Sequence, residues 1–150
     1  MISATARATC AVSLVLVFSA MAFAVDGPRD EQAALKTILP KFEKVWNARD
    51  LDAFMNLFHP ESRMKTRYDG DPAVREKMKT DFVGLLDEFG AVKSYEIRGY
   101  IERKGRFVVR VTYEKKDVVP GTFAVKKDDK GNWLILDFNI DGQSEPELKQ

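Results

Sequence analysis

The chain has 150 residues, of which 45% are hydrophobic, with 24 basic and 23 acidic side chains and a single histidine. A net charge this close to zero creates no long-range field that would attract nucleic acid or an anionic membrane surface, so we expect neither as a partner. One histidine also excludes a zinc site of the usual two- or three-histidine kind. The length suits one domain of ordinary size.

The first 24 residues have the pattern of a secretory signal peptide. A single basic residue, Arg7, precedes an apolar run over residues 11–24, which ends in the small-x-small sequence that signal peptidase cleaves. The run is shorter than the roughly 20 residues that a membrane-spanning helix needs. We therefore expect a secreted or periplasmic chain that starts at Val25, has no membrane anchor and lacks a cysteine, because Cys10 is removed with the leader.

Apolar residues at spacings of three and four predict three helices in the first half of the mature chain. They are expected over residues 28–48, 51–58 and 73–89. Asp50 is placed to be the N-cap of the second helix, and Gly90 to be the left-handed residue that ends the third. Pro40 lies inside the first helix, where it removes a backbone hydrogen bond, so we expect a kink or a break there.

At Ala91 the apolar period changes from 3.6 to 2, which predicts that an antiparallel sheet follows the helices. The strands are expected around residues 95–101, 106–113, 123–125 and 133–140. Residues 63–68 also alternate and suggest a short fifth strand. This order predicts an α+β domain over residues 25–140, with three helices on one face of a sheet of four to five strands. Residues 141–150 are polar and are expected to form a flexible tail.

The alternation also assigns side chains to the two faces of the sheet. On the inner face of the first and last strands we expect Tyr95, Ile97, Ile101, Leu134, Leu136, Phe138 and Ile140. Tyr100, Val108 and Thr112 fall on the opposite face among charged residues. They form either a mixed solvent face or a surface for homodimer contact.

Several segments carry a resemblance to a known superfamily. Residues 46–54 and the sequence Leu57-Phe58-His59-Pro60 resemble the opening helical pair of the nuclear transport factor 2-like superfamily, and residues 89–97 and 131–138 look like its small secreted bacterial members. The resemblance covers residues 31–140 and implies a cone-shaped fold, in which helices and a curved sheet enclose an apolar cavity. It carries over no catalytic residue, because none of the motifs of the enzymatic branches matches.

The candidate binding residues are those expected on inward faces or near the mouth of such a cavity. They are Trp46, Phe58, His59, Tyr68, Tyr95 and Phe138. The aromatic residues either fill the core or line a ligand pocket. His59 is either a residue that ends the second helix and hydrogen-bonds its last carbonyls, or a proton donor at the cavity mouth.

The expected function is that of a non-catalytic module that binds a small, mostly apolar molecule. No Gly-x-Ser-x-Gly motif surrounds a serine and no glycine-rich phosphate loop is present, so we expect no catalytic residue, metal or cofactor. One alternative is a small lyase, isomerase or hydrolase of the polyketide-cyclase-like type, which would use His59 with Tyr68 or Arg63. Another is a protein-binding module that acts through the outer face of the sheet.

Overall fold

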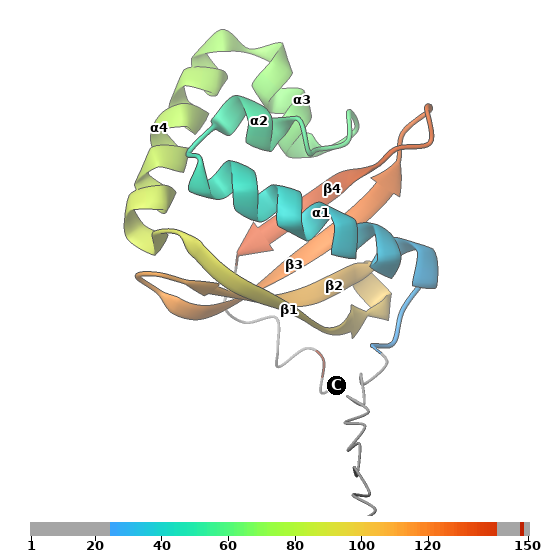
Figure 1. Ribbon diagram of the computed structural model, residues 1–150. Helices are drawn as coiled ribbons and strands as arrows, with labels where there is room; N and C mark the ends of the chain where they lie inside the picture. Colours follow the sequence, from blue (N-terminus) through green and yellow to red (C-terminus); the bar gives the residue numbers. More distant parts are fainter. Residues whose placement is uncertain (1–24, 141–147, 149–150) are drawn as a thin grey trace, which may run out of the picture.

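The computed structural model describes residues 25–140 and Leu148. In it the helices precede the strands along the chain, as the sequence predicts (Figure 1). The helices are α1 (Arg29–Asn47), α2 (Leu51–Met55), α3 (Arg63–Gly70) and α4 (Pro72–Phe89). The strands are β1 (Val92–Ile101), β2 (Arg106–Tyr113), β3 (Asp117–Lys127) and β4 (Trp133–Ile140), with a 3-10 turn, η1 (Glu102–Lys104), after β1. The strands pair antiparallel in the order β1-β2-β3-β4, which confirms the α+β class.

Two predicted segments lie outside the described residues. They are the signal peptide, residues 1–24, and the tail, residues 141–150 apart from Leu148. Among the helices that the structure does describe, none combines the length and the apolar character needed to cross a membrane.

α1 is continuous from Arg29 to Asn47 with Pro40 in its interior, so of the two expected outcomes, a kink or a break, the structure rules out the break. The residues on either side of the proline explain why the helix tolerates it, because Leu39 and Phe42 are buried against the sheet. In proteins, packing of an apolar face contributes more to helix stability than local propensity does. The N-cap of α2 is confirmed, since the Asp50 carboxylate accepts a hydrogen bond from the backbone N–H of Ala53 at 3.0 Å.

Gly90 ends α4 as predicted, but in a different conformation. Its φ of 73° and ψ of −165° lie in an extended region that is essentially restricted to glycine, rather than in the left-handed helical region. Its N–H still donates to the carbonyl of Leu86 at 2.9 Å. The chain therefore turns sharply from α4 into β1, which begins at Val92, next to the predicted change of period.

Residues 63–68 form a helix, α3, and not the suggested fifth strand. Met64 and Tyr68 fit the alternating pattern, but their spacing of four residues fits a helix equally well. Two local interactions favour the helix: Lys65 pairs with Asp69 one turn later at 3.1 Å, and the hydroxyl of Thr66 donates to the carbonyl of Ser62 at 2.9 Å. A segment this short contains too few residues to distinguish the helical period of 3.6 residues from the strand period of 2.

A bulge in β1 changes which side chains face the helices. Ile97 pairs with Val109 and Gly99 pairs with Val108, so Arg98 is an extra residue in β1. Beyond the bulge, Tyr100 packs against the core, and Ile101 lies outside that core although it is buried. The predicted faces of Tyr100 and Ile101 are therefore exchanged.

A bulge in β4 also changes which side chains face the helices. Leu136 is the extra residue there, because Ala124 and Val125 pair with Asp137 and Ile135. Ile135 is consequently the fully buried residue, in place of the predicted Leu134 and Leu136, whereas Phe138 and Ile140 pack against the core as predicted. Bulges bend the strands that carry them and increase their twist.

The outer face of the sheet is more covered than the sequence predicts. Val108, which the alternation places among exposed charges on this face, is fully buried. Leu148 lies over Gly99, the partner of Val108 in β1, and a Cβ at Gly99 would meet Leu148 Cδ2 at 2.8 Å. This part of the face is therefore not an open surface.

Aromatic rings fill the space between α1 and the sheet. Phe42 is fully buried, and its ring centroid lies 5.7 Å from that of Trp46, 5.5 Å from that of Phe123 and 5.3 Å from that of Phe138. Such distances are typical of well-packed aromatic pairs. α1 is thereby fixed directly on the sheet (Figure 1).

Candidate functional site

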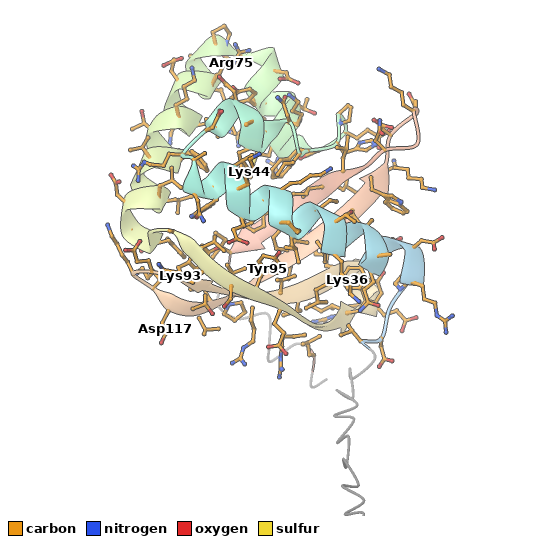
Figure 2. The ribbon with its side chains drawn as sticks, in the orientation of Figure 1. Lys36, Lys44, Arg75, Lys93, Tyr95 and Asp117 are labelled. Atoms are coloured by element: carbon orange, nitrogen blue, oxygen red, sulfur yellow. The ribbon has the colours of Figure 1, made fainter. Side chains whose placement is uncertain are left out.

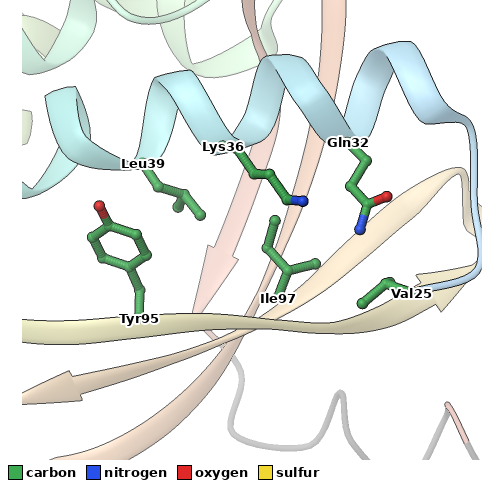
Figure 3. A pocket seen from close by; sticks show the side chains of 6 residues that line it. All are labelled: Val25, Gln32, Lys36, Leu39, Tyr95 and Ile97. Atoms are coloured by element: carbon green, nitrogen blue, oxygen red, sulfur yellow. The ribbon is translucent and has the colours of Figure 1, made fainter. Parts of the chain in front are cut away.

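Two clefts open beside this aromatic interior. The larger has a volume of about 640 Å³ and lies between α2, α3, α4 and β4. The smaller has a volume of about 290 Å³ and lies between the first half of α1 and β1 (Figure 3). Small-molecule sites typically occupy roughly 300–1,000 Å³, so the larger cleft, which we call the α3–α4 cleft, is the candidate site. Its lining residues are Trp46, Leu51, Phe54, Arg63, Met64, Arg67, Val74, Lys77, Met78, Asp81, Phe82, Leu85, Asp137 and Phe138.

α4 supplies one wall of the cleft because its apolar stripe is wider than its contact with the core. Val74, Met78, Phe82 and Leu85 recur at spacings of three and four, which places them on one side of the helix. Phe82 is buried, with its ring centroid 5.7 Å from that of Trp46. Leu85 remains 39% exposed. One edge of the stripe therefore attaches α4 to the core, and the other edge faces the cleft.

The floor of the cleft is aromatic and fixed in place. The indole N–H of Trp46 donates to the carbonyl of Gly90 at 2.9 Å, so its polar group is satisfied away from the apolar ring surface. Phe54 lies beside it with a centroid distance of 6.3 Å, and Phe138 packs on Phe123 at 4.8 Å. Trp46 and Phe54 are buried and Phe138 is half-buried, so a ligand entering the cleft would mainly meet the ring of Phe138, whose orientation the core already determines.

The charged lining residues differ in how they are paired. Asp81 forms an ion pair with Lys77 at 2.7 Å on the same helix, and Asp137 is paired with Arg106. Arg63 and Arg67 are exposed on α3, and within the described part of the chain neither guanidinium has a hydrogen-bond or ion-pair partner. The α3 side of the rim is therefore positive and unneutralised.

The smaller cleft combines apolar and polar groups. Tyr95 extends from β1 toward α1 and lies beside Leu39, while Lys36 and Gln32 extend from α1 (Figures 2 and 3). Burial raises the pKa of the Tyr95 phenol, and the nearby carboxylate of Glu43 adds to the effect. Tyr95 is consequently a neutral hydroxyl at physiological pH.

His59 is a structural cross-link between the loop after α2 and the sheet. It is buried, its Nε2 donates to the carbonyl of Lys127 at 3.1 Å, and its Nδ1 accepts from the backbone N–H of Glu61 at 3.0 Å. The Glu61 N–H assigns the proton of the neutral ring to Nε2. Next to it, the His59 N–H donates to Ile135 O at 2.8 Å. The expected bonds from the His59 ring to the last carbonyls of α2 are therefore wrong, because both ring nitrogens have other backbone partners.

The six sequence-predicted site residues are not brought together. Trp46 and Phe138 line the α3–α4 cleft, and Tyr95 lines the smaller one. The lining of neither cleft includes Phe58, His59 or Tyr68. Tyr68 is buried, with the Lys65 ammonium 5.6 Å and the Arg75 guanidinium 5.1 Å from the centre of its ring.

Sequence reasoning missed Met64 and Arg67 as lining residues because they lie on α3, which it interpreted as a strand. The spacing of four residues between Arg63 and Arg67 is the signal that would have placed both on one helical face.

No group of three or more histidine, cysteine, aspartate or glutamate side chains is arranged to hold a metal ion in residues 25–140. No protein-family model matches the chain, and no curated protein sequence matches it significantly.

Proposed function

We propose that this protein is a secreted or periplasmic, non-catalytic binding module whose α3–α4 cleft holds a small, mostly apolar molecule. The observation that carries the proposal is an aromatic floor joined to apolar walls that remain partly exposed, in a cleft of about 640 Å³. Apolar surface removed from water is worth roughly 25 cal/mol per Å². A ligand that covers Met64, Met78 and Leu85 would gain this free energy without requiring the core to move.

The chemistry of the lining supports binding rather than catalysis. Its described residues include no histidine, serine, threonine, cysteine or tyrosine, so it offers no hydroxyl, thiol or imidazole nucleophile. Its two carboxylates, Asp81 and Asp137, are held in ion pairs. His59, the residue on which an enzymatic alternative would depend, has both ring nitrogens bonded to backbone groups.

Fluorescence of Trp46 tests the proposal directly because the indole forms part of the floor. The chain contains two tryptophans, and Trp133→Phe leaves Trp46 as the reporter. Titration of this variant with 1-decanol is expected to change the emission in a saturable manner. Emission that changes only in proportion to added alcohol would contradict the proposal.

Two substitutions on α4 localise the binding. Leu85→Asp places a carboxylate in the cleft wall and is expected to weaken decanol binding about tenfold or more, equivalent to about 1.4 kcal/mol. Val83→Asp is the matched control, because Val83 lies on the same helix, is 47% exposed and does not line the cleft. Equal affinity in the two variants would place the binding site elsewhere.

A further inference from the structure

We infer that the ligand of the α3–α4 cleft is an amphipathic monoanion, with an oxyanion head group held by Arg63 and Arg67 and an apolar body against the aromatic floor. The inference rests on the proposed function and adds the chemical class of the ligand. It is based on the arrangement of charge around the cleft and on the character of its walls.

Arg63 and Arg67 are placed to hold one anion together. They lie four residues apart on α3, and side chains at this spacing are neighbours on a helix, with Cβ atoms about 5–6 Å apart. Both line the cleft. A guanidinium donates through a planar fork that matches the geometry of a carboxylate or phosphate, and two forks can bind the oxygens of one head group.

The neighbouring charges do not neutralise this pair. The acids of the cleft, Asp81 and Asp137, already pair with Lys77 and Arg106. On α3 itself, the remaining acidic side chain is Asp69, and it pairs with Lys65. The positive charge of Arg63 and Arg67 is therefore available to a ligand, and it disfavours a cationic one.

The apolar body of the ligand is inferred from the side chains next to these arginines. Met64 is on the same helix and Met78 is on the opposing one, and both line the cleft. Methionine side chains are flexible and polarisable, so they adapt to alkyl or aryl groups of different shape. Beyond them, Trp46 and Phe138 provide the apolar floor. Trp46 is already buried without a ligand, so the surface that an anion without an apolar part would leave in water is that of Met64, Met78 and Phe138.

Three probes of equal chain length test the inference: decanoate, 1-decanol and decyltrimethylammonium, each titrated at neutral pH below its aggregation limit and followed by Trp46 fluorescence in the Trp133→Phe chain. We expect decanoate to bind about tenfold tighter than decanol, and the cation to bind more weakly than either. Added salt is expected to reduce the advantage of decanoate because exposed charges are screened.

Substitution of the arginines identifies the source of that advantage. Arg63→Gln combined with Arg67→Gln is expected to abolish the preference for decanoate, so that decanoate and decanol bind this variant with similar affinity. Lys41→Gln combined with Lys44→Gln is the matched control, since it also removes two positive charges, at exposed residues of α1 that do not line the cleft. The control is expected to keep the preference for decanoate.

The outcomes separate this inference from the proposed function. If decanol binds in the cleft but decanoate binds no tighter, or if the double variant keeps the preference, the inference is overturned and the proposed function stands. If none of the three probes binds, both are overturned. Binding to phosphatidylglycerol vesicles without binding to dissolved decanoate would also overturn the inference, because a lipid surface would then be the partner.

Discussion

The interior beneath α1 and the α3–α4 cleft contain the same kinds of apolar side chain, yet one is closed and the other is open. α1 lies directly on the sheet. Beneath it, the rings of Phe42 and Phe123 are in contact, and both side chains are fully buried. α3 and α4 are joined through Asp71 and lie on either side of α2 in the view of Figure 1. Only some of their apolar residues are buried in the core, and others, such as Leu85, remain partly exposed in the cleft.

The largest expected loss of stability follows a substitution in the closed region beneath α1. Phe42→Ala is expected to lower the free energy of unfolding by about 3–5 kcal/mol, because it leaves a cavity among rings that cannot collapse onto one another. Leu85→Ala in the open cleft is expected to cost about 1 kcal/mol or less, since Leu85 is already partly exposed. Urea denaturation measures both. Similar costs for the two variants would remove the distinction between the regions.

A second, intermediate effect concerns His59. His59→Ala is expected to lower the free energy of unfolding by about 2–3 kcal/mol, because it leaves the Glu61 N–H and the Lys127 carbonyl without their partner. Affinity for decanol is expected to stay unchanged, since His59 does not line the cleft. A variant of normal stability that no longer binds would contradict this structural role.

The smallest expected change in stability at neutral pH is that of Tyr113→Phe. The ring of Tyr113 lies in the closed region. Burial raises the pKa of its phenol well above the ordinary value of about 10. The folded state therefore favours the protonated form, so this contribution to stability is complete below about pH 10 and is lost as the pH rises beyond it. Tyr113→Phe is expected to reduce the loss of stability between neutral pH and alkaline pH.

Tyr95→Phe provides the comparison from the open smaller cleft. Tyr95 is only partly buried, so its substitution is expected to change the alkaline dependence of stability less than Tyr113→Phe does. Urea denaturation at a series of pH values measures both variants. A larger effect at Tyr95 would contradict the assignment of the region around Tyr113 as the closed one.

The sequence predicts the α+β class, the aromatic interior and, to within one residue, the ends of α1, α4, β2 and β4, because each depends on a periodic pattern or on a cap. The bulges at Arg98 and Leu136 could not be predicted in this way. An extra residue leaves the local composition unchanged and exchanges the faces of the neighbouring strand residues. Alternation alone therefore misassigns Tyr100 and Leu134. These errors arise from strand pairing, which is a tertiary property.

The candidate site was predictable only in part. Trp46 and Phe138 were found because large aromatic residues on inward faces are visible in the sequence. Arg67 was missed because α3 is too short for its period to be distinguished from that of a strand. The distance between α4 and the core depends on how the helices pack together, and no local sequence pattern predicts it.

Methionine methyl groups provide the most direct test of where a ligand binds. Met64 and Met78 line the α3–α4 cleft, whereas Met55 is fully buried in the core. NMR spectra of the chain labelled at its methionine methyl groups would be recorded during a titration with 1-decanol. We predict that the signals of Met64 and Met78 shift in a saturable manner while that of Met55 stays in place. Shifts at Met55 alone, or no shift at Met64 and Met78, would contradict binding in the α3–α4 cleft.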